Sequence, residues 1–295
     1  MGKMGAEIIR QRGVIMRAKI IDGKKMADGL LEKAKQEIAL LARPPCLAIV
    51  MAGDDPASQV YVKKKLDACK KVGILSKDIH LQSSASEKEI IGAVNRLNKD
   101  DGVDAILVQV PLPGTVDEDR ILSEVSPGKD VDGFHPLNFG KLALNNSELI
   151  PCTPRGIIHM LKESGVQLSG MHAVVIGRSR IVGKPLALLL LNENCTVTIC
   201  HSRTPGVGAF TRQADIVCVA VGKPKTLTAD MIRQGAVVID AGTNRQGEKL
   251  AGDVDFAAVK EKASLITPVP GGVGPMTVAM LIKNTIACYR LRGGK

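Results

Sequence analysis

Aromatic residues are scarce in this chain of 295 residues, which has no tryptophan, two tyrosines and four phenylalanines. Its cores must therefore be built from valine, isoleucine, leucine, alanine and methionine. Lysine and arginine outnumber aspartate and glutamate by 40 to 30, yet no basic run is longer than Lys63 to Lys65. Without stacking aromatics or a basic arm, the sequence argues against nucleic-acid binding. The positive charge suits an anionic small molecule, or is simply a solvated basic surface.

Patterns for metal binding and for membrane spans are also missing. The seven cysteines are scattered and form no C-x-x-C pair, which favours reduced thiols and argues against a zinc site. No apolar run approaches the roughly 18 residues that a membrane span requires. We therefore expect a cytoplasmic protein with no metal and no membrane association. Residues 1–18, with four basic residues and one acidic residue, are expected to be an N-terminal extension, either an organellar targeting peptide or a disordered segment.

The first half of the chain alternates strand and helix patterns. Asp55-Pro56 and Gly73 mark the start and end of one helix, and the capping box Ser86-x-x-Glu89 opens another. The predicted elements are helix 30–41, strand 46–51, helix 57–72, strand 77–82, helix 86–98 and strand 105–110. This βαβαβ order implies an α/β fold with a parallel sheet, in which ligands bind beyond the carboxyl ends of the strands.

A second strand and helix series follows the junction Pro151-Cys-Thr-Pro154, which opens a predicted helix over 155–164. Strands are predicted at 172–176, 196–200, 215–220 and 236–240, a series typical of a Rossmann-like sheet. The turn from Gly177 to Gly183 precedes a helix predicted over 186–191, where dinucleotide-binding proteins present backbone N–H groups to phosphate. Because the spacing is not G-x-G-x-x-G, a merely tight turn is the alternative.

The residues after the second of these strands bear on the choice of cofactor. NAD-binding sheets place an acidic residue there to hold the ribose 2′-hydroxyl, whereas this chain has His201, Ser202 and Arg203. A hydroxyl and a cation accept the 2′-phosphate that a carboxylate would repel, so the sequence favours NADP over NAD. Arg178 in the glycine turn adds a second cation. The alternative is that both arginines are solvated turn residues.

Polar side chains gather at the strand ends of the first half. Tyr61 and Lys65 lie four residues apart on a predicted helix and therefore share one face. Lys64, three residues after Tyr61, satisfies the same geometry, so periodicity does not choose between the two lysines. Gln109 lies near the end of a predicted strand and Asp132 in a later loop. A ring, an amine, an amide and a carboxylate are together expected to form an active site.

The segment from Pro268 to Thr277 is the most unusual in the chain. Its first eight residues contain three prolines and three glycines, which fix some backbone dihedrals and free others. Such a composition suits a rigid loop whose backbone approaches a ligand, with a structural linker as the alternative. A helix is predicted to follow over 276–291.

Together these segments resemble the bifunctional methylenetetrahydrofolate dehydrogenase/methenyltetrahydrofolate cyclohydrolase family. The matching blocks are Tyr61-Val-Lys-Lys-Lys65, Val108-Gln-Val-Pro-Leu-Pro113, Lys129-Asp-Val-Asp-Gly-Phe134, Pro151-Cys-Thr-Pro154, Gly177-Arg-Ser179 with Val182-Gly183, and Pro268 to Thr277. The resemblance implies two α/β domains with a cleft between them, assembled as a homodimer. Residues 19–150 are implied to form a catalytic folate-binding domain, completed by a C-terminal helix over 276–295, and residues 151–275 a Rossmann-like NADP-binding domain.

The resemblance also implies roles by motif position. Lys65, rather than Lys64, matches the essential lysine, Tyr61 the ring that stacks on the folate, and Gln109 and Asp132 its partners at the substrate, so these four are the implied catalytic residues. The implied substrate-binding residues are Tyr61, Val108, Gln109, Val110, Asp132, Pro270, Gly271, Gly272, Val273, Gly274, Pro275, Met276 and Thr277. The implied cofactor-binding residues are Gly177, Arg178, Ser179, Ile181, His201, Ser202, Arg203, Gly222 and Thr243.

The implied activity is oxidation of 5,10-methylenetetrahydrofolate by NADP, followed by hydrolysis of the product to 10-formyltetrahydrofolate. Polyglutamylated tetrahydrofolates are the expected partners. One rival is an NADP-dependent dehydrogenase of a small keto acid, which would need the glycine turn but not the segment 268–277. A second rival, a non-enzymatic protein that binds polyanions, would need basic clusters that are sparse here.

Overall fold

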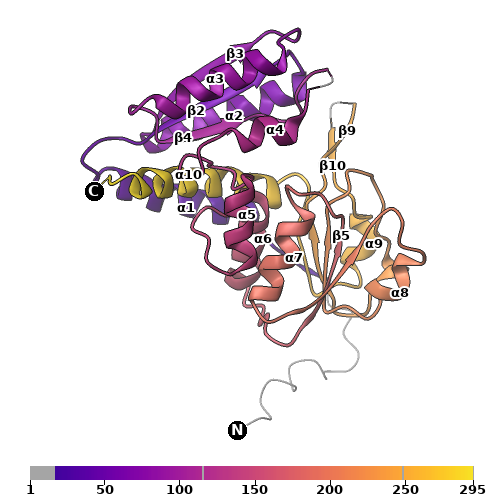
Figure 1. Cartoon of the computed structure of the whole chain (residues 1–295). Helices are drawn as coiled ribbons and strands as arrows, with labels where there is room; N and C mark the ends of the chain where they lie inside the picture. Colours follow the sequence, from indigo (N-terminus) through magenta and orange to yellow (C-terminus); the bar gives the residue numbers. More distant parts are fainter. Residues whose placement is uncertain (1–16, 115, 248, 295) are drawn as a thin grey trace.

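The computed structural model describes residues 17–114, 116–247 and 249–294, which form two α/β bodies joined by helices (Figure 1). The expected N-terminal extension falls almost entirely outside the described residues. In the first body β2 (Cys46–Ala52) lies between β3 (Leu75–Leu81) and β4 (Ala105–Val108), and all three strands are parallel. Helices α2 (Pro56–Val72) and α3 (Glu87–Lys99) connect them. The predicted βαβαβ order is confirmed, although β4 ends at Val108 and leaves Gln109 just beyond the strand.

The ends of α2 and α3 follow from local sequence chemistry. The Asp55 carboxylate accepts a hydrogen bond from the backbone N–H of Ser58 at 2.7 Å, and the left-handed Gly73 (φ 88°) ends α2. At the start of α3 both hydrogen bonds of the predicted capping box between Ser86 and Glu89 are present. These caps fix the helix that carries Tyr61 and Lys65 relative to the sheet.

The second body is built on a six-stranded sheet with the order β1-β11-β8-β7-β5-β6, in which every neighbouring pair is parallel. Its strands are β1 (Lys19–Ile20), β5 (His172–Ile176), β6 (Thr196–Cys200), β7 (Ile216–Val219), β8 (Val237–Asp240) and β11 (Leu265–Ile266). The carboxyl ends of these strands therefore meet at one edge. Because β1 pairs with β11, Lys19 and Ile20 belong to this second sheet, although the expected boundary placed residue 19 onward in the catalytic domain.

The remaining elements cover the sheets and connect the two bodies. They are α1 (Gly23–Ile38), α4 (Glu118–Ser123), α5 (Pro136–Ala143), α6 (Cys152–Glu163), α7 (Gly183–Asn192), α8 (Val207–Thr211), the 3₁₀ helix η2 (Ala229–Met231), the antiparallel hairpin β9 (Asn244–Gln246) and β10 (Lys249–Ala251), α9 (Phe256–Lys260) and α10 (Val273–Leu291). Across the described ranges, no helix combines the length and the apolar character needed to cross a bilayer.

Three helices begin earlier than the sequence predicted, and the reason is the same for each. Helices α6, α7 and α10 were expected to start after Pro154, Pro185 and Pro275, but each proline instead occupies the third helical position. The first N–H groups of a helix have no partner within it, so a first-turn proline loses no hydrogen bond. Helix α1, predicted over 30–41, also begins earlier, at Gly23. Its cap is Asp22, whose carboxylate accepts from the N–H of Lys25 at 2.9 Å.

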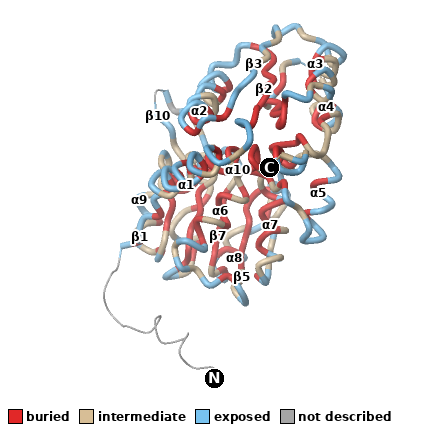
Figure 2. Tube along the Cα trace, turned by 90° about the vertical axis from the view of Figure 1, so that its left-hand side faces the viewer, coloured by how far each residue is buried: buried red, intermediate tan, exposed pale blue. Residues whose placement is uncertain are grey.

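Helix α10 joins the two bodies. It packs on α1 and α6 and runs between the sheets, where Figure 2 shows buried residues in the strands of both bodies. One apolar cluster includes Ile49 from the first sheet, Val175 from the second and Met280 from α10. Asn284, also fully buried, donates to the carbonyl oxygens of Val131 and Ile150, both at 2.8 Å. A shared core therefore fixes the cleft between the bodies.

A buried carboxylate anchors the end of α10 to the first body. Asp104, with no exposed surface, accepts two hydrogen bonds of 2.7 Å from the guanidinium of Arg43 and one of 2.8 Å from the N–H of Cys46. The guanidinium of Arg292, just beyond α10, lies 3.4 Å from the same carboxylate. The exposed Asp101 pairs with Arg292 at 3.2 Å.

Candidate functional site

Two adjoining cavities lie between the two bodies. The larger has a volume of about 380 Å³ and the smaller about 290 Å³. They share six lining residues, which come from α2, from the loop after β8 and from α10: Tyr61, Ala241, Thr243, Val273, Gly274 and Val278. Because both bodies supply shared residues, the two cavities are parts of one cleft.

The smaller cavity contains an amine held by an amide. The Nζ atom of Lys65 donates to Oε1 of Gln109 at 2.9 Å. The side-chain nitrogen of Gln109 donates to the carbonyl oxygen of Val110 at 2.7 Å, so the amide is fixed with its oxygen toward the lysine. Gln109 is 9% exposed, and Lys65 is only partly buried. This arrangement joins α2 to the end of β4 and directs the Lys65 amine into the cavity.

Asp132 lines the same cavity and has an unusual protonation equilibrium. Burial raises the pKa of its carboxyl to about 6, while the positive charge of Lys65 opposes this and the neighbouring Asp130 adds to it. Asp130 is buried and accepts hydrogen bonds from the backbone N–H groups of Phe134 and His135 at 3.2 and 2.8 Å. Asp130 thus shapes the loop, whereas Asp132 faces the cavity as a carboxylate that titrates close to neutrality.

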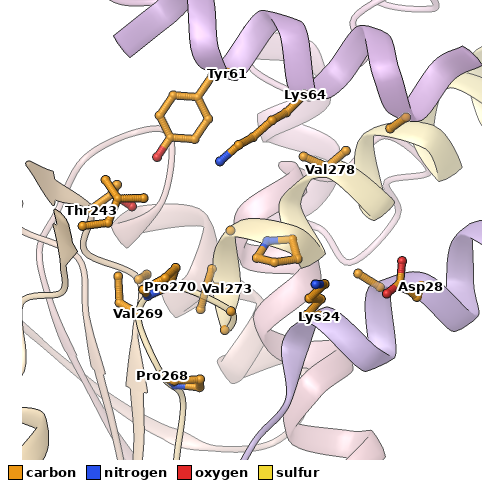
Figure 3. Close-up of a pocket in the computed structure, with 18 of the residues that line it drawn as sticks. Lys24, Asp28, Tyr61, Lys64, Thr243, Pro268, Val269, Pro270, Val273 and Val278 are labelled. Carbon is orange, nitrogen blue, oxygen red and sulfur yellow. The ribbon is translucent and has the colours of Figure 1, made fainter. Parts of the chain in front are cut away.

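The structure separates Lys64 from Lys65, which sequence periodicity could not do. The Nζ atom of Lys64 lies 5.7 Å from the centre of the Tyr61 ring, and Lys64 lines the larger cavity. In Figure 3 Tyr61 and Lys64 both project from α2 into that cavity. Lys65, one residue later, lines only the smaller cavity. Lys65 is therefore the lysine beside Gln109 and Asp132.

The larger cavity combines an apolar floor with several lysines. Its floor is the segment 268–275, and Figure 3 shows Pro268, Val269 and Pro270 from this segment facing α1 and α2. Lys24 from α1 and Lys71 from α2 line it together with Lys64. Lys71 pairs with Asp28 at 3.2 Å. The cavity therefore offers a long apolar surface, with three lysines and two aspartates, Asp28 and Asp67, on its helical side.

Most of the expected substrate residues line this cleft. Tyr61, Val108, Gln109, Val110, Asp132, Val273, Gly274 and Thr277 line the smaller cavity, and Pro270, Gly271, Gly272 and Pro275 line the larger. Met276 differs: it is fully buried, belongs to the apolar core and lines neither cavity. As the fourth residue of α10, it points away from the residues of the first turn that face the cleft. Met276 is therefore a packing residue and not a substrate contact.

Sequence reasoning did not assign six residues of the smaller cavity to the site, namely Phe134, Cys152, Thr153, Val182, Ala241 and Val278. Cys152 and Thr153 were missed because their segment was interpreted as a domain junction. The Thr153 hydroxyl lies 2.9 Å from that of Thr277 and joins the starts of α6 and α10. The Cys152 thiol donates to the carbonyl oxygen of Val131 at 3.7 Å, and burial raises the pKa of this thiol well above its ordinary value. The signal available in the sequence was that Cys152 directly follows Pro151, where the second predicted domain begins.

The glycine turn of the second sheet is tightly closed. A Cβ atom on Gly177, which has φ 127°, would lie 2.4 Å from the carbonyl oxygen of Ala220, and one on Gly183 would lie 2.2 Å from the carbonyl oxygen of Gly177. The Ser179 hydroxyl accepts from the N–H groups of Val182 and Gly183 at 3.2 and 3.3 Å. Arg178 is exposed beside this turn. The start of α7 is thereby open to an anion at the sheet edge.

The other expected cofactor residues follow neighbouring strands at the same edge. Ser202 and Arg203 are exposed after β6, in a turn where the N–H of Arg203 donates to the ring of His201 at 3.1 Å. Gly222 follows β7, and Thr243 follows β8 and lines both cavities. Ile181 lines the smaller cavity. Among the residues that the structure places, no group of three His, Cys, Asp or Glu side chains could hold a metal ion.

Comparisons with known proteins agree with this arrangement. The model of the tetrahydrofolate dehydrogenase/cyclohydrolase catalytic domain matches residues 21–132, and the model of the NAD(P)-binding domain of the same family matches residues 151–292. The bifunctional protein FolD of Exiguobacterium sibiricum is 52% identical over 272 residues, which cover 91% of this chain and 98% of that protein. That of Campylobacter hominis is 53% identical over 277 residues, covering 92% and 98%.

Solved structures give the same result. The bifunctional FolD enzyme of Campylobacter jejuni superposes with a TM-score of 0.91 at 45% identity, over 92% of this chain and 99% of that one. The enzyme of Trypanosoma brucei, solved with NADP cofactor and an inhibitor, superposes with a TM-score of 0.91 at 37% identity, over 93% and 98%. Two family models, close relatives of nearly the same length and a shared two-domain fold place this chain in the tetrahydrofolate dehydrogenase/cyclohydrolase family.

Proposed function

We propose that this chain oxidises 5,10-methylenetetrahydrofolate to 5,10-methenyltetrahydrofolate with NADP and then hydrolyses that product to 10-formyltetrahydrofolate. The observation that carries the proposal is the 2.9 Å hydrogen bond between Lys65 and Gln109 in a cavity that Asp132 also lines. An amine, an amide and a carboxylate at one end of a cleft between two domains supply what both steps need. The product would supply one-carbon units, for example for purine biosynthesis.

The pterin is proposed to bind in the smaller cavity. Above its pKa of about 6, Asp132 is a carboxylate and can accept hydrogen bonds from the amino group and a ring N–H of the pterin. Tyr61 offers a ring on which the folate stacks, and the backbone of Val273 and Gly274 closes the other side. Oxidation is mainly a matter of orientation, because the one-carbon bridge must face the nicotinamide at close range.

NADP is proposed to bind at the carboxyl edge of the second sheet, on one side of the cleft. When it is bound, NADP accepts the hydride. The turn from Gly177 to Gly183 packs so closely that a Cβ atom on either glycine would meet backbone carbonyl oxygens, and it leads into the start of α7, whose N–H groups would bind the pyrophosphate. Ser202, Arg203 and Arg178 are exposed at neighbouring positions, where a hydroxyl and two cations suit the 2′-phosphate of NADP. The related enzyme of Trypanosoma brucei was solved with NADP, which supports NADP as the cofactor here.

Hydrolysis requires proton transfer, and Lys65 is proposed to carry it. Water adds to the methenyl carbon, and the Lys65 amine takes up the proton that this water releases. The same proton then passes to the ring nitrogen as the carbon–nitrogen bond breaks, and the proton of the new hydroxyl is released to solvent as the carbonyl forms, so that the formyl group stays on the other nitrogen. Gln109 holds Nζ in place throughout, since its own amide is fixed by the carbonyl of Val110.

The larger cavity is proposed to hold the benzoyl-glutamate part of the substrate and a polyglutamate tail. It opens from the smaller cavity past Tyr61 and Thr243, which line both. Its lysines, Lys24, Lys64 and Lys71, would pair with the tail carboxylates, and its proline-rich floor would contact the aromatic ring. Part of the net positive charge of the chain would then bind the substrate tail.

A homodimer is proposed through the exposed edge of the second sheet. Strand β6 ends the sheet order, and an edge strand presents unpaired backbone groups that can meet a second copy about a twofold axis. Apolar side chains are exposed on and near this edge, namely Leu191, Ile199 and Phe210. Light scattering after size-exclusion chromatography measures the mass in solution, and we expect the mass of two chains.

The first test of the proposed function is an absorbance assay that separates formation of the methenyl compound from its hydrolysis. The wild type should perform both steps with NADP, and Lys65→Ala should lose hydrolysis. Lys63→Ala is the matched control, because Lys63 is exposed on the same helix and lines neither cavity. If the folded wild type turns over neither folate, or if Lys65→Ala hydrolyses at the wild-type rate, the proposal is wrong.

A further inference from the structure

Two buried carboxylates lie beside the loops on the cofactor side of the cleft, and one of them, Asp240, also lines the larger cavity. Asp240, at the end of β8, is 2% exposed, and Asp253, before α9, has no exposed surface. Neither carboxylate is paired with a cation in the described residues. Instead, each accepts three hydrogen bonds from N–H groups. A buried carboxylate that is stabilised only by N–H donors requires those donors in defined positions.

The donors come from loops that face the cleft. One oxygen of Asp253 accepts from the N–H groups of Val221 and Gly222 at 2.7 and 2.9 Å, and the other from the side-chain amide of Asn244 at 2.8 Å. Val221 and Gly222 follow β7, and Asn244 follows Thr243 in the loop after β8. Asp253 therefore ties together the two loops that carry Gly222 and Thr243.

Asp240 holds Asp253 in place. Its oxygens accept from the backbone N–H groups of Gly242, Asp253 and Val254 at 3.0, 2.9 and 3.0 Å. Burial raises the pKa of the Asp240 carboxyl, and these three N–H groups oppose that effect. The two aspartates thus form one unit: Asp240 fixes the backbone of Asp253, and the side chain of Asp253 fixes the loops.

Two glycines show how closely this unit is packed. A Cβ atom on Gly242 would lie 2.2 Å from the carboxyl carbon of Asp253, and one on Gly252 would lie 1.9 Å from a carboxylate oxygen of Asp240. The Asp253 carboxylate therefore lies directly against Gly242, near Asp240 in the sequence, and the Asp240 carboxylate lies directly against Gly252, next to Asp253. No side chain larger than hydrogen fits at either position without moving a carboxylate.

We propose that Asp253, supported by Asp240, is a positioning residue for the dehydrogenase step. Asp253 lines neither cavity, so it acts through the backbone of Val221 and Gly222 and through the loop of Thr243. These loops lie on the cofactor side, whereas Lys65, Gln109 and Asp132 are held by other contacts in the first body. The inference rests on the proposed function and adds that the dehydrogenase step depends on Asp253 more than the hydrolysis step does.

The physical reason is the number of buried donors that one side chain satisfies. Removal of the Asp253 carboxylate leaves two backbone N–H groups and one amide without their acceptor, and the loops must move to find new partners. A displacement near 1 Å at a hydride-transfer site is enough for a large loss of rate. Hydrolysis of the methenyl compound uses no nucleotide, so it does not depend on Val221 and Gly222, which line neither cavity, and it involves the second loop only through the folate contacts of Ala241 to Thr243.

The test compares the two activities in Asp253→Asn and Asp253→Ala. We expect kcat/KM for NADP in the dehydrogenase reaction to fall at least about 10-fold in Asp253→Ala, with a smaller fall in Asp253→Asn. Hydrolysis of added methenyltetrahydrofolate should stay within about twofold of wild type. The control Asp255→Asn makes the same charge change two residues away, at a partly buried position, and should leave both activities unchanged.

A second variant keeps the Asp253 carboxylate and changes only its position. Gly252→Ala, at a position that lines neither cavity, inserts a methyl group against Asp240, which holds Asp253, and should give the same selective loss of the NADP reaction, whereas Gly29→Ala, where a Cβ meets nothing within 4 Å, should not. Equal losses of both activities, or an unchanged kcat/KM for NADP in Asp253→Ala, would overturn the inference. If the wild type itself lacks folate turnover, the proposed function falls instead.

Discussion

The protonation of Asp132 gives a prediction in which stability and activity change in opposite directions. The pKa of this carboxyl is raised from its ordinary 3.8 to about 6, mainly by burial. Each pKa unit corresponds to about 1.4 kcal/mol, so the ionised carboxylate costs the native state up to about 3 kcal/mol. Asp132→Asn removes the charge at nearly constant volume and should recover part of this cost. At pH 7.5 we therefore expect the variant to be more stable than wild type.

The pH dependence follows from the sign of the change. Below pH 3.8 the carboxyl is protonated in both native and unfolded chains and contributes nothing. Between pH 3.8 and 6 the native state holds the proton more tightly, so the cost of ionisation grows as the pH rises. Above pH 6 the cost is fully present. The stability gain of Asp132→Asn should thus be largest above pH 6 and shrink toward zero near pH 4.

Urea denaturation of both proteins between pH 4 and pH 8 measures this difference. Asp78→Asn, on an exposed position of β3, is the control and should show no comparable gain. The same Asp132→Asn variant should bind folate at least about 10-fold more weakly, because the amide has a donor NH2 group where the carboxylate has its second acceptor oxygen. A variant that is less stable than wild type at pH 7.5, or a gain that is constant with pH, would refute the reasoning.

Three further predictions concern other parts of the chain. Asp104→Ala should lower the free energy of unfolding by about 2–4 kcal/mol in urea titrations, because it strips a buried acceptor from two arginines, whereas the exposed Asp101→Ala should have no measurable effect. Ser202→Glu should raise KM for NADP at least about 10-fold with little change for NAD, and equal effects on both would argue against 2′-phosphate recognition at this turn. Lys24→Ala with Lys71→Ala should reduce the preference for pentaglutamyl over monoglutamyl substrate in competition assays, and an unchanged ratio would place the tail elsewhere.

The sequence predicted the parallel sheets because they depend on local signals. The alternation of strands and helices, the cap at Asp55 and the capping box at Ser86 each need only neighbouring residues to be recognised. The starts of α6, α7 and α10 were placed too late because proline was treated as a barrier before the helix, whereas it is tolerated anywhere in the first turn. Local chemistry therefore determined the elements better than their ends.

Features that depend on contacts distant in sequence were not predictable in the same way. Tyr61 allows two lysines by spacing, and only the position of Gln109, 44 residues after Lys65, distinguishes them in space. The partner of β1 lies about 245 residues further on, and a two-residue strand has no periodicity of its own. Met276 was assigned to the substrate because it lies inside a motif, but a motif does not say which side of a helix faces the cleft. The three-dimensional arrangement decides each of these.

The pairing of β1 with β11 and the central place of α10 have a consequence for how the chain is made. During synthesis, Lys19 and Ile20 leave the ribosome long before their partners Leu265 and Ile266, and α10 emerges last of the described helices. Until then, the apolar face of α1 and the inner side of α6 lack the helix that covers them. The nascent chain therefore carries uncovered apolar surface until α10 has emerged, and a chaperone that acts on this protein would find its binding sites on those two helices.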